Sequence, residues 1–170
     1  GGVGTGDDSN VDTELYNGTS WTEVNNLNNG RGLAVGAGTV NTAALLTSGR
    51  TASQAVYNET EIWNGTSWTE VNNLNTARYY SSGDGTSTAA ILAGGEPGSG
   101  ATADTETWNG TSWTEVNNLN TARAELTSMG TSAAAIAATG NAPTVNAETW
   151  NGTSWTEVNN VNTARTLLAG

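Results

Sequence analysis

One twelve-residue phrase occurs four times in this chain and constrains its fold more than any other feature. It reads NGTSWTEVNNLN from Asn17, Asn64 and Asn109, and NGTSWTEVNNVN from Asn151. Its tryptophans lie 47, 45 and 42 residues apart, at Trp21, Trp68, Trp113 and Trp155. A repeat of this length, filled with strand-like segments, is typical of a β-propeller, in which each repeat forms one four-stranded sheet. We therefore expect an all-β fold.

The repeat that spans residues 76–120 shows the expected strands most clearly. Residues 79–83, 88–93, 105–108 and 112–116 are short strand-like segments, and residues 88–93 are small and apolar, as in a buried strand. Asn109-Gly110 predicts a type I′ hairpin, because both central residues of that turn need a positive φ. The Thr-Ser that follows would widen this turn to four residues. Gly83-Asp84-Gly85 predicts another turn, after the first strand.

This arrangement resembles the kelch repeat, and the resemblance covers essentially the whole chain. The matching elements are Gly94-Gly95 after the second strand, Trp108 in the third, Trp113 at the start of the fourth, and Arg78 or Arg123 before the next first strand. It implies kelch-type blades, although other repeats replace the paired glycine with Ser-Gly or Thr-Gly. The phrase WNGTSWTEVNNLNTAR is also similar to kelch-type repeats in predicted structural proteins of marine bacteriophages. That similarity implies a virion or host-contact role and a virion or extracellular location.

We expect one domain, residues 1–170, with about four blades. The repeats are approximately residues 1–28, 29–75, 76–120 and 121–162, and residues 163–170 would form a closing strand. The first repeat supplies only a third and a fourth strand, while Arg165–Gly170 matches a first strand. A blade split between the termini would protect both free edges but would lack one strand. Three alternatives remain open: a ring with a defective blade, a piece of a longer array, or a homo-oligomer whose chains complete each other.

The composition excludes several classes of function. Five basic and sixteen acidic residues give a net charge of −11, so the chain lacks the basic footprint that nucleic acid or an anionic lipid surface requires. No apolar run is long enough for membrane insertion. The chain has no His and no Cys, which removes imidazole bases, thiol nucleophiles and His- or Cys-bound metals. Acid pairs for glycoside cleavage are conceivable, but repeated acids in identical frames favour a structural role. We expect no enzyme and no cofactor.

One arginine follows each NNLN or NNVN segment, at Arg31, Arg78, Arg123 and Arg165. Two acid series could pair with these arginines and fix neighbouring blades, because the planar guanidinium binds carboxylates well. One series lies in the fourth strands, at Glu23, Glu70, Glu115 and Glu157, and the other in the third strands, at Glu14, Glu61, Glu106 and Glu148. The alternative is a ring of cations that lines a channel mouth and binds an anion. The neighbouring Asn pairs could cap turns or bind sugar hydroxyls.

The segments between second and third strands differ from repeat to repeat. They are residues 3–12, 50–59, 96–104 and 141–147, and in an up-and-down blade they emerge opposite to the Asn-Gly turns. Variable loops on a rigid scaffold are common recognition sites, although drift in unconstrained loops explains the variation equally well. The candidate binding residues are Asp7, Asp8, Asn10, Asp12, Arg50, Gln54, Glu96, Asp104, Asn141 and Asn146. The acids of the first loop offer oxygen ligands for Ca²⁺, without the spacing of an EF-hand.

These features predict a non-catalytic binding or structural module that contacts a surface glycan or protein through its variable loops. A purely architectural or self-assembling scaffold without a ligand is the alternative. An engineered repeat protein is a third, against which the divergence of the first and second strands argues.

Overall fold

The computed structural model describes residues 2–3, 9–141 and 144–166. This part of the chain is all-β, with antiparallel strand pairs and no helix. It accordingly holds no helix of the length and apolarity needed to cross a membrane. The prediction of an all-β fold is confirmed for these residues.

Three antiparallel sheets have four strands each, joined in sequence order. The first consists of β5 (Val35–Val40), β6 (Ala43–Thr47), β7 (Thr60–Trp63) and β8 (Trp68–Val71). The second consists of β9 (Ser82–Thr86), β10 (Ala89–Ala93), β11 (Thr105–Trp108) and β12 (Trp113–Val116). The third consists of β13 (Thr127–Thr131), β14 (Ala134–Ala138), β15 (Ala147–Trp150) and β16 (Trp155–Val158).

Two shorter sheets lie at the N-terminal end of the chain. Strands β3 (Thr13–Tyr16) and β4 (Trp21–Val24) form a hairpin that corresponds to β7–β8 of the next repeat. Strands β1 (Gly2–Val3) and β2 (Ser9–Asn10) pair in the same way as the base of the 50–56 loop, where Arg50 forms a bridge with Val56. The described part of the first repeat therefore contains the outer half of a sheet, as the sequence predicts.

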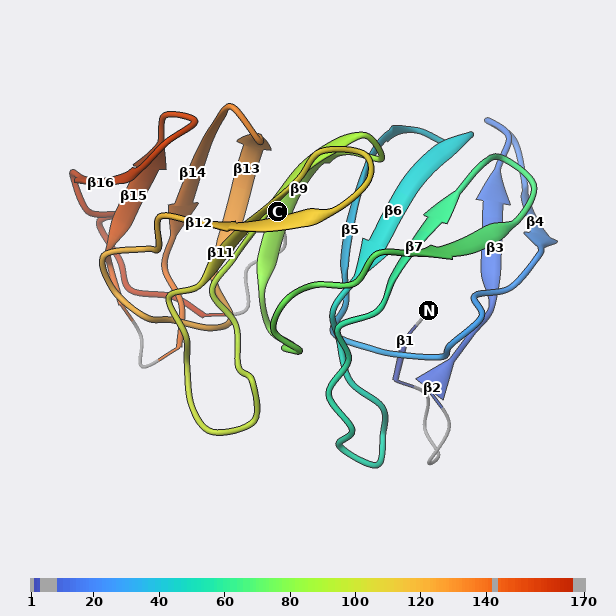
Figure 1. Ribbon diagram of the computed structural model, residues 1–170, viewed down its shortest axis with the longest axis horizontal. Coiled ribbons are helices and arrows are strands. Elements are labelled where there is room, and N and C mark those ends of the chain that lie inside the picture. The colour runs from blue at the N-terminus through green and yellow to red at the C-terminus, as the bar shows by residue number, and fades with distance from the viewer. Residues whose placement is uncertain (1, 4–8, 142–143, 167–170) are drawn as a thin grey trace.

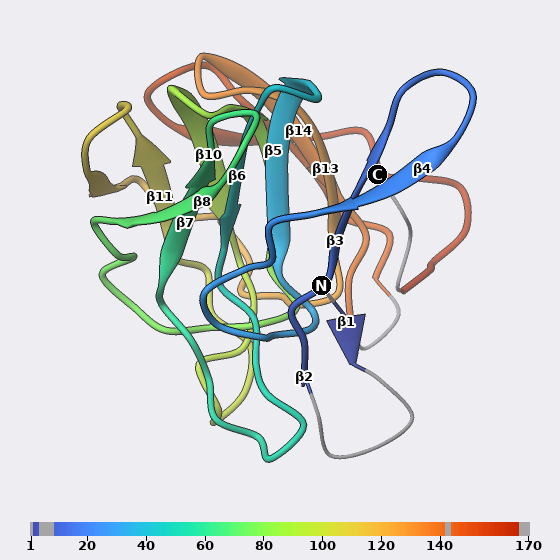
Figure 2. The same ribbon diagram turned by 90° about the vertical axis from the view of Figure 1, so that its right-hand side faces the viewer.

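The sheets stand face to face in a β-propeller-like arrangement. Figure 1 shows β3, β5, β9 and β13 following one another across the molecule. Strand β9 contacts β5 on one side and β13 on the other. In the turned view, β5, β13 and β14 occupy the middle, while β7, β8 and β11 lie to one side and β4 to the other (Figure 2).

Tight packing of these inner strands explains why the turn predicted at Gly83-Asp84-Gly85 is wrong. Gly83-Asp84-Gly85 lies inside strand β9 and forms no turn, because the chain reverses later, at Ser87 and Thr88. A Cβ atom on Gly83 would lie 2.9 Å from Cγ1 of Val35 in β5 and 2.5 Å from the carbonyl oxygen of Ile91. Glycine is needed there for close approach of two strands, a role that short sequence patterns do not separate from a turn.

The Asn-Gly turns are four-residue loops and differ in detail from the predicted type I′ hairpin. Gly65 has a φ of 92°, but Asn64 is not among the described residues with positive φ. Instead the Asn64 side-chain oxygen accepts hydrogen bonds from the amides of Thr66 and Ser67, both at 2.9 Å. The same pair of bonds forms at Asn17, Asn109 and Asn151. The asparagine therefore acts through its side chain.

Two apolar cores fill the spaces between consecutive four-stranded sheets. Between the first and second sheets, Leu45 packs with Leu92, Trp108 and Trp113. Between the second and third sheets, Ile91 and Leu119 pack with the next pair of tryptophans, Trp150 and Trp155. In each four-stranded sheet the tryptophans of the third and fourth strands are cross-strand neighbours with ring centroids 5.5 Å apart. Each sheet thus presents a tryptophan pair to the sheet before it.

The hairpin β3–β4 lacks such a preceding sheet among the described residues. Its Trp21 is 65% exposed, whereas Trp113 is 6% exposed. Trp21 therefore stays exposed, since a neighbouring sheet is what buries the equivalent tryptophans.

Candidate functional site

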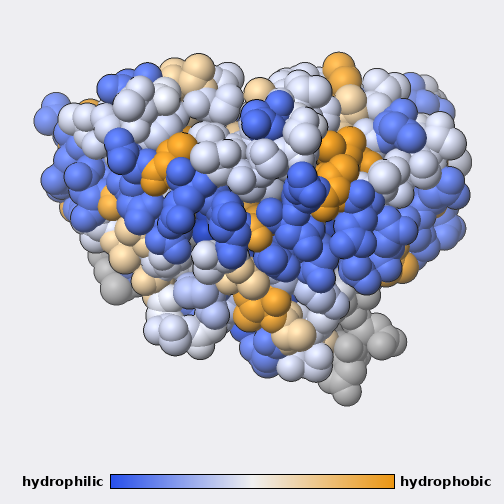
Figure 3. Space-filling model, viewed as in Figure 1, coloured by the Kyte–Doolittle hydropathy of each residue, from blue (hydrophilic) through white to orange (hydrophobic). Residues whose placement is uncertain are grey.

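The loops between second and third strands emerge together at one edge of the molecule. In Figure 1 the loops around residues 50–56 and 96–104 project downward, whereas the Asn-Gly turns lie along the upper edge. This is the placement that alternating strand directions require. The surface seen from this side is mostly hydrophilic, with small and separate apolar patches (Figure 3). We call the edge that carries the variable loops the variable face.

Five side chains gather on the variable face, between the first and second four-stranded sheets. The guanidinium of Arg50 lies 4.4 Å from the ring centroid of Tyr79 and 5.6 Å from that of Tyr80. The two tyrosine rings are 5.0 Å apart. Arg50 also donates a 2.6 Å hydrogen bond to the side chain of Gln54, and the Tyr79 hydroxyl donates a 2.7 Å bond to Glu96. We call Arg50, Gln54, Tyr79, Tyr80 and Glu96 the tyrosine cluster.

Main-chain hydrogen bonds, both between and within repeats, hold this cluster together. The amide of Gly49 donates to the carbonyl of Arg78 at 2.9 Å, which fixes the residue before Tyr79 against the start of the 50–56 loop. Tyr79 and Glu96 exchange two main-chain bonds, of 3.1 and 2.8 Å. The loops of two repeats thus meet at the segment that connects them.

Tyr80 adopts an unusual backbone conformation, with a φ of 54°. The corresponding residues of the neighbouring repeats, Leu33 and Glu125, have φ values of 56° and 55°. A positive φ is costly for residues other than glycine, and surrounding structure must hold it in place. The repeat therefore presents a different side chain at a fixed position on the variable face in each sheet.

The electrostatics of the cluster depend on the Tyr79 hydroxyl. Its hydrogen bond to Glu96 raises the pKa of Tyr79 above the usual 10.0, with smaller contributions from burial and from the charge of Glu96, while Arg50 opposes the shift. Tyrosine and arginine provide large, stiff contact surfaces with polar ends, the residue types that dominate many binding sites. The cluster offers two aromatic rings, tilted by 49° to each other, with hydrogen-bond donors and acceptors at its rim.

Sequence analysis identified Arg50, Gln54 and Glu96 as candidates but missed both tyrosines. Variation between repeats also marks these two positions, because the two residues after the repeated arginine are Gly-Leu, Tyr-Tyr and Ala-Glu in the three complete repeats. The first strand that the sequence predicts, residues 79–83, includes both tyrosines, whereas β9 begins at Ser82. They belong instead to the entry segment, on the variable face.

The other candidate residues that the structure describes have local roles. Asn10 accepts the amide of Asp12 at 2.7 Å, and Asn141 accepts the amide of Ala124 at 3.0 Å. The carboxylates of Asp12 and Asp104 accept equivalent side-chain bonds, from Asn26 and Asn118. The carbonyl of Asn146 accepts a bond from Arg123. Asp7 and Asp8 lie outside the described residues.

The structure provides no built cation site in its described part. Among the described residues, no three His, Cys, Asp or Glu side chains form a group that could hold a metal ion. Of the acids considered as Ca²⁺ ligands, only Asp12 is described, and its carboxylate bonds to Asn26. The Ca²⁺ hypothesis thus rests on the sequence of the first loop alone.

The repeated arginines pair with the acids of the third strands. Arg31 lies 2.8 Å from Glu61, Arg78 lies 3.0 Å from Glu106, and Arg123 lies 2.7 Å from Glu148. These six side chains are almost fully buried, so desolvation lowers the pKa of each arginine while its glutamate opposes that shift. Three of the four arginines are therefore buried inside the protein. The alternative prediction, a ring of cations that lines a channel mouth, is wrong for these three. Arg165 is exposed.

The Asn pairs of the NNLN segments are also committed to main-chain contacts. Asn72 donates a 2.9 Å bond to the carbonyl of Thr111 in the next repeat, and Asn73 accepts the amide of Thr60 at 3.3 Å. Equivalent bonds form in the other repeats, at Asn25, Asn26, Asn117 and Asn118. Their role in these positions is to bind the backbone, and the sugar-binding alternative is not needed to explain them.

A hollow separate from the tyrosine cluster lies along the inner strands β5, β9 and β13. Its volume is about 310 Å³, and its polar lining includes Asp84, Ser82 and Ser128. The Asp84 carboxylate accepts 2.6 Å bonds from the amides of Gly85 and Gly130, and the two serine hydroxyls bond to each other at 2.8 Å. Of its polar side chains, Asp84, Ser82 and Ser128 bond within the protein, while the buried Ser81 hydroxyl has no hydrogen-bond partner among the described residues. Since most of these polar groups are already paired, the tyrosine cluster remains the stronger candidate site. No protein family and no curated protein sequence matches this chain.

Proposed function

We propose that this protein is a non-catalytic binding module that contacts a surface glycan or protein through its variable face. The observation that carries the proposal is the tyrosine cluster. It combines two adjacent tyrosines, whose rings are tilted by 49° to each other, with an arginine and an acid from two loops that differ between repeats. Such a surface can bind the apolar face of a sugar or a peptide while its rim forms hydrogen bonds. Nucleic acid and membrane insertion are not part of this proposal.

The scaffold in this proposal is a kelch-type β-propeller of about four blades within residues 1–170. The face-to-face sheets and their repeated tryptophan pairs support it, as does the match of Gly94-Gly95 and Trp108 to the kelch pattern. By the same resemblance we place the module in a phage virion, as part of a tail or fibre, and therefore outside the cell. In that setting the chain needs no catalytic group, and it contains neither His nor Cys.

Binding to a glycan array and to intact cells would test this function. We expect Tyr79→Ala and Arg50→Ala each to lower the signal at least about tenfold, since aromatic and arginine residues dominate binding energy. Replacing residues 96–104 with Gly and Ser should abolish it. Thr114→Ala is the control, because Thr114 is exposed on β12 and belongs neither to the tyrosine cluster nor to the variable loops.

Two further observations decide the outcome. Removing glycans from the cells, or digesting their surface proteins, distinguishes a carbohydrate from a protein ligand. Binding that survives both cluster substitutions and the loop replacement would contradict the proposal, as would an equal loss in the Thr114 control.

A purely architectural scaffold is the second candidate, and the recurrence of identical bonds between sheets favours it. Its expected result is a folded protein with no ligand on any array or cell, whose only partner is another copy of itself. Loss of cell binding on cluster substitution would exclude it.

A further inference from the structure

Each contact between consecutive repeats uses the same set of polar bonds. In the first contact, Asn25 donates a 2.9 Å bond to the carbonyl of Thr66. Asn28 donates two 2.8 Å bonds to one oxygen of Glu61, through its amide and its side chain. Arg31 binds the other oxygen of Glu61 at 2.8 Å. One glutamate therefore accepts from an arginine and an asparagine of the preceding connection.

The second and third contacts repeat this set. Asn72, Asn75 and Arg78 contact Thr111 and Glu106, and Asn117, Asn120 and Arg123 contact Thr153 and Glu148. The donors always lie on the connection that follows a fourth strand. The acceptors always lie on the third strand, and on the turn after it, of the next sheet. The contact is therefore directional, with a donor side and an acceptor side.

A fourth set of donors follows the last strand, β16. Asn159, Asn162 and Arg165 occupy the positions of Asn117, Asn120 and Arg123, and all three are exposed. The backbone of this segment is placed as in the other repeats, because the carbonyl of Arg165 accepts the amide of Gly140 at 3.2 Å. Within the described residues, the Arg165 side chain has no carboxylate partner. Among the described residues, the donor side of a contact is thus formed without a following sheet.

The matching acceptors lie at the other end of the described chain. On the hairpin β3–β4, Glu14 occupies the position of Glu61 and Thr19 that of Thr66, and both are exposed. Alternation along the strands places Glu14, Tyr16 and Trp21 on one face of this hairpin. Tyr16 is 44% and Trp21 65% exposed. The acceptor side is therefore also formed, with its aromatic pair uncovered.

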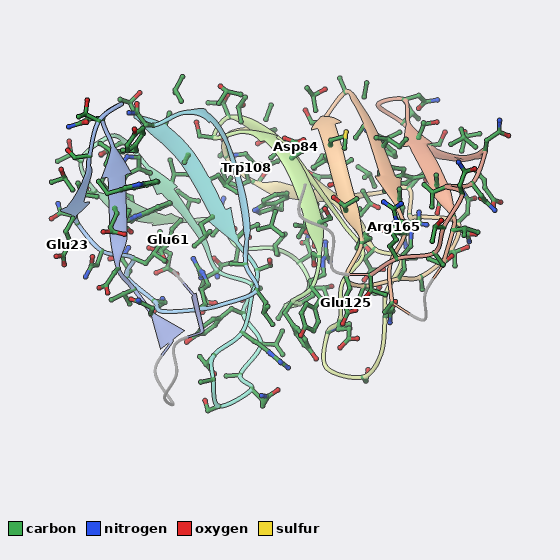
Figure 4. The ribbon with its side chains drawn as sticks, turned by 180° about the vertical axis from the view of Figure 1, so that it is seen from behind. Glu23, Glu61, Asp84, Trp108, Glu125 and Arg165 are labelled. Atoms are coloured by element: carbon green, nitrogen blue, oxygen red, sulfur yellow. The ribbon has the colours of Figure 1, made fainter. Side chains whose placement is uncertain are left out.

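The two sides are apart within one chain. Figure 4 shows Glu23, the cross-strand neighbour of Glu14, at one end of the molecule and Arg165 well towards the other. We propose that Asn159, Asn162 and Arg165 of one copy bind Glu14 and Thr19 of a second copy, in a head-to-tail contact. The occupant of the open β3–β4 face is thus the third sheet of another copy of this chain, which reproduces the contact used inside each chain.

Charge and apolar surface both fit this assignment. A chain with a net charge of −11 repels its copies in general, so a contact needs a specific cation at its centre, and Arg165 supplies it. Val158, 38% exposed on the last strand, would be covered together with Tyr16 and Trp21. Repetition of the same heterologous contact forms a closed ring of copies if the rotation between copies closes, and an open chain of copies if it does not.

One difference makes this contact weaker than the internal ones. The indole nitrogens of Trp68, Trp113 and Trp155 donate to the hydroxyls of Thr13, Thr60 and Thr105 in the preceding sheet. The corresponding residue of the last sheet is Ala147, so the indole of Trp21 gains no such bond. We therefore expect association that depends on concentration.

Analytical ultracentrifugation of the full chain over a wide concentration range tests the proposal. We expect the mass to rise with concentration, and Glu14→Ala and Arg165→Ala each to raise the association Kd at least about tenfold, as breaking a desolvated charge pair does. Glu23→Ala is the matched control, since Glu23 is also an exposed acid, directly opposite Glu14 on the same hairpin. It should change the Kd by less than about threefold, because no equivalent acid forms an ion pair among the described residues.

Mixing the two variants tests the head-to-tail arrangement directly. The Glu14→Ala chain keeps its donor side and the Arg165→Ala chain keeps its acceptor side. The mixture should therefore form dimers, and nothing larger, at concentrations where each variant alone is monomeric. A wild-type monomer at every concentration would overturn the proposal, as would a mixture that stays monomeric or a Glu23 control that dissociates like Glu14→Ala. The contact does not involve the tyrosine cluster, so glycan or protein binding can succeed or fail independently.

Discussion

The same twelve-residue phrase has two different environments in this molecule, and the difference shows what the phrase alone encodes. In the second sheet, Trp113 is 6% exposed and Glu106 is buried against Arg78, whereas the equivalent Trp21 and Glu14 of the first repeat are exposed. The hairpin register is the same in both places, with Trp108 opposite Trp113 and Tyr16 opposite Trp21. The phrase therefore encodes a hairpin, and an adjacent sheet supplies its burial. This is the behaviour of repeat proteins, whose stability comes from contacts between neighbours.

The largest difference in stability between the two environments should appear when the glutamate of the third strand, which is buried in one and exposed in the other, is substituted. We expect Glu106→Ala to lower the free energy of unfolding by about 5 kcal/mol, because it leaves the buried Arg78 unpaired and also removes two bonds from Asn75. Glu14→Ala should cost less than about 0.5 kcal/mol at concentrations where the chain is a monomer. Urea denaturation of both variants measures the two values.

Glu115→Ala serves as the control for the loss of charge. Glu115 is the exposed cross-strand neighbour of Glu106 and forms no ion pair among the described residues. A comparable destabilisation by Glu115→Ala, or a small effect of Glu106→Ala, would show that the buried pair is not what joins these repeats.

For the tryptophans, the free energy of unfolding lost on substitution should also differ between the two environments, by slightly less than for the glutamates. We expect Trp113→Ala to cost about 4 kcal/mol, since it opens a cavity between two sheets and removes a 2.9 Å bond to Thr60. Trp21→Ala should cost less than about 0.5 kcal/mol in the monomer. Hydrogen exchange of the amides in β3–β4 and β11–β12 would report each hairpin separately. Equal losses would mean that the hairpin itself, and not the neighbouring sheet, provides the stability.

Much of this architecture could be predicted from the sequence because it is local. The third strand of the second sheet begins and ends at Thr105 and Trp108 as expected, and the hairpin loops begin at the predicted asparagines. The features that were missed depend on distant residues. Gly83 lies in a strand because Val35 approaches it, and Trp21 is exposed because no described sheet precedes it.

The candidate site could be predicted only in part for the same reason. Variation between repeats pointed to Arg50 and Glu96, but not to the segment between them that brings the two loops together. Neither acid series could be chosen as the arginine partner from spacing alone. Glu106 is next to Trp108 on the buried face of its strand, while its neighbour Glu115 is exposed, a difference that only the packed sheets reveal.

The turn glycines should show no difference between the environments, which makes them a sharp test of what is local. Gly18 and Gly65 have φ values of 97° and 92°, and the nearest atom to a Cβ on Gly65 would be 3.4 Å away, with none within 4 Å at Gly18. Gly18→Ala and Gly65→Ala should each destabilise their own hairpin by about 1 kcal/mol, the cost of a left-handed conformation for a residue with a Cβ. Hydrogen exchange in β3–β4 and β7–β8 measures both. A clearly smaller loss at Gly18 would mean that the end hairpin relaxes its turn and is not an equivalent unit.

The smallest expected effect lies on the variable face, where neighbouring repeats meet through half-exposed side chains. Because Glu96 accepts a bond from the protonated Tyr79 hydroxyl, the pKa of Tyr79 is higher in the folded protein than its usual 10.0. The stability from this bond is therefore complete below pH 10.0 and is lost as the pH rises through the higher folded pKa. Glu96→Gln should lower the pKa of Tyr79, seen as an earlier phenolate absorbance that Tyr79→Phe removes. An unchanged titration in Glu96→Gln would mean that the bond to Glu96 does not raise the pKa of Tyr79, and that the entry segment and the 96–104 loop are not joined through these two side chains.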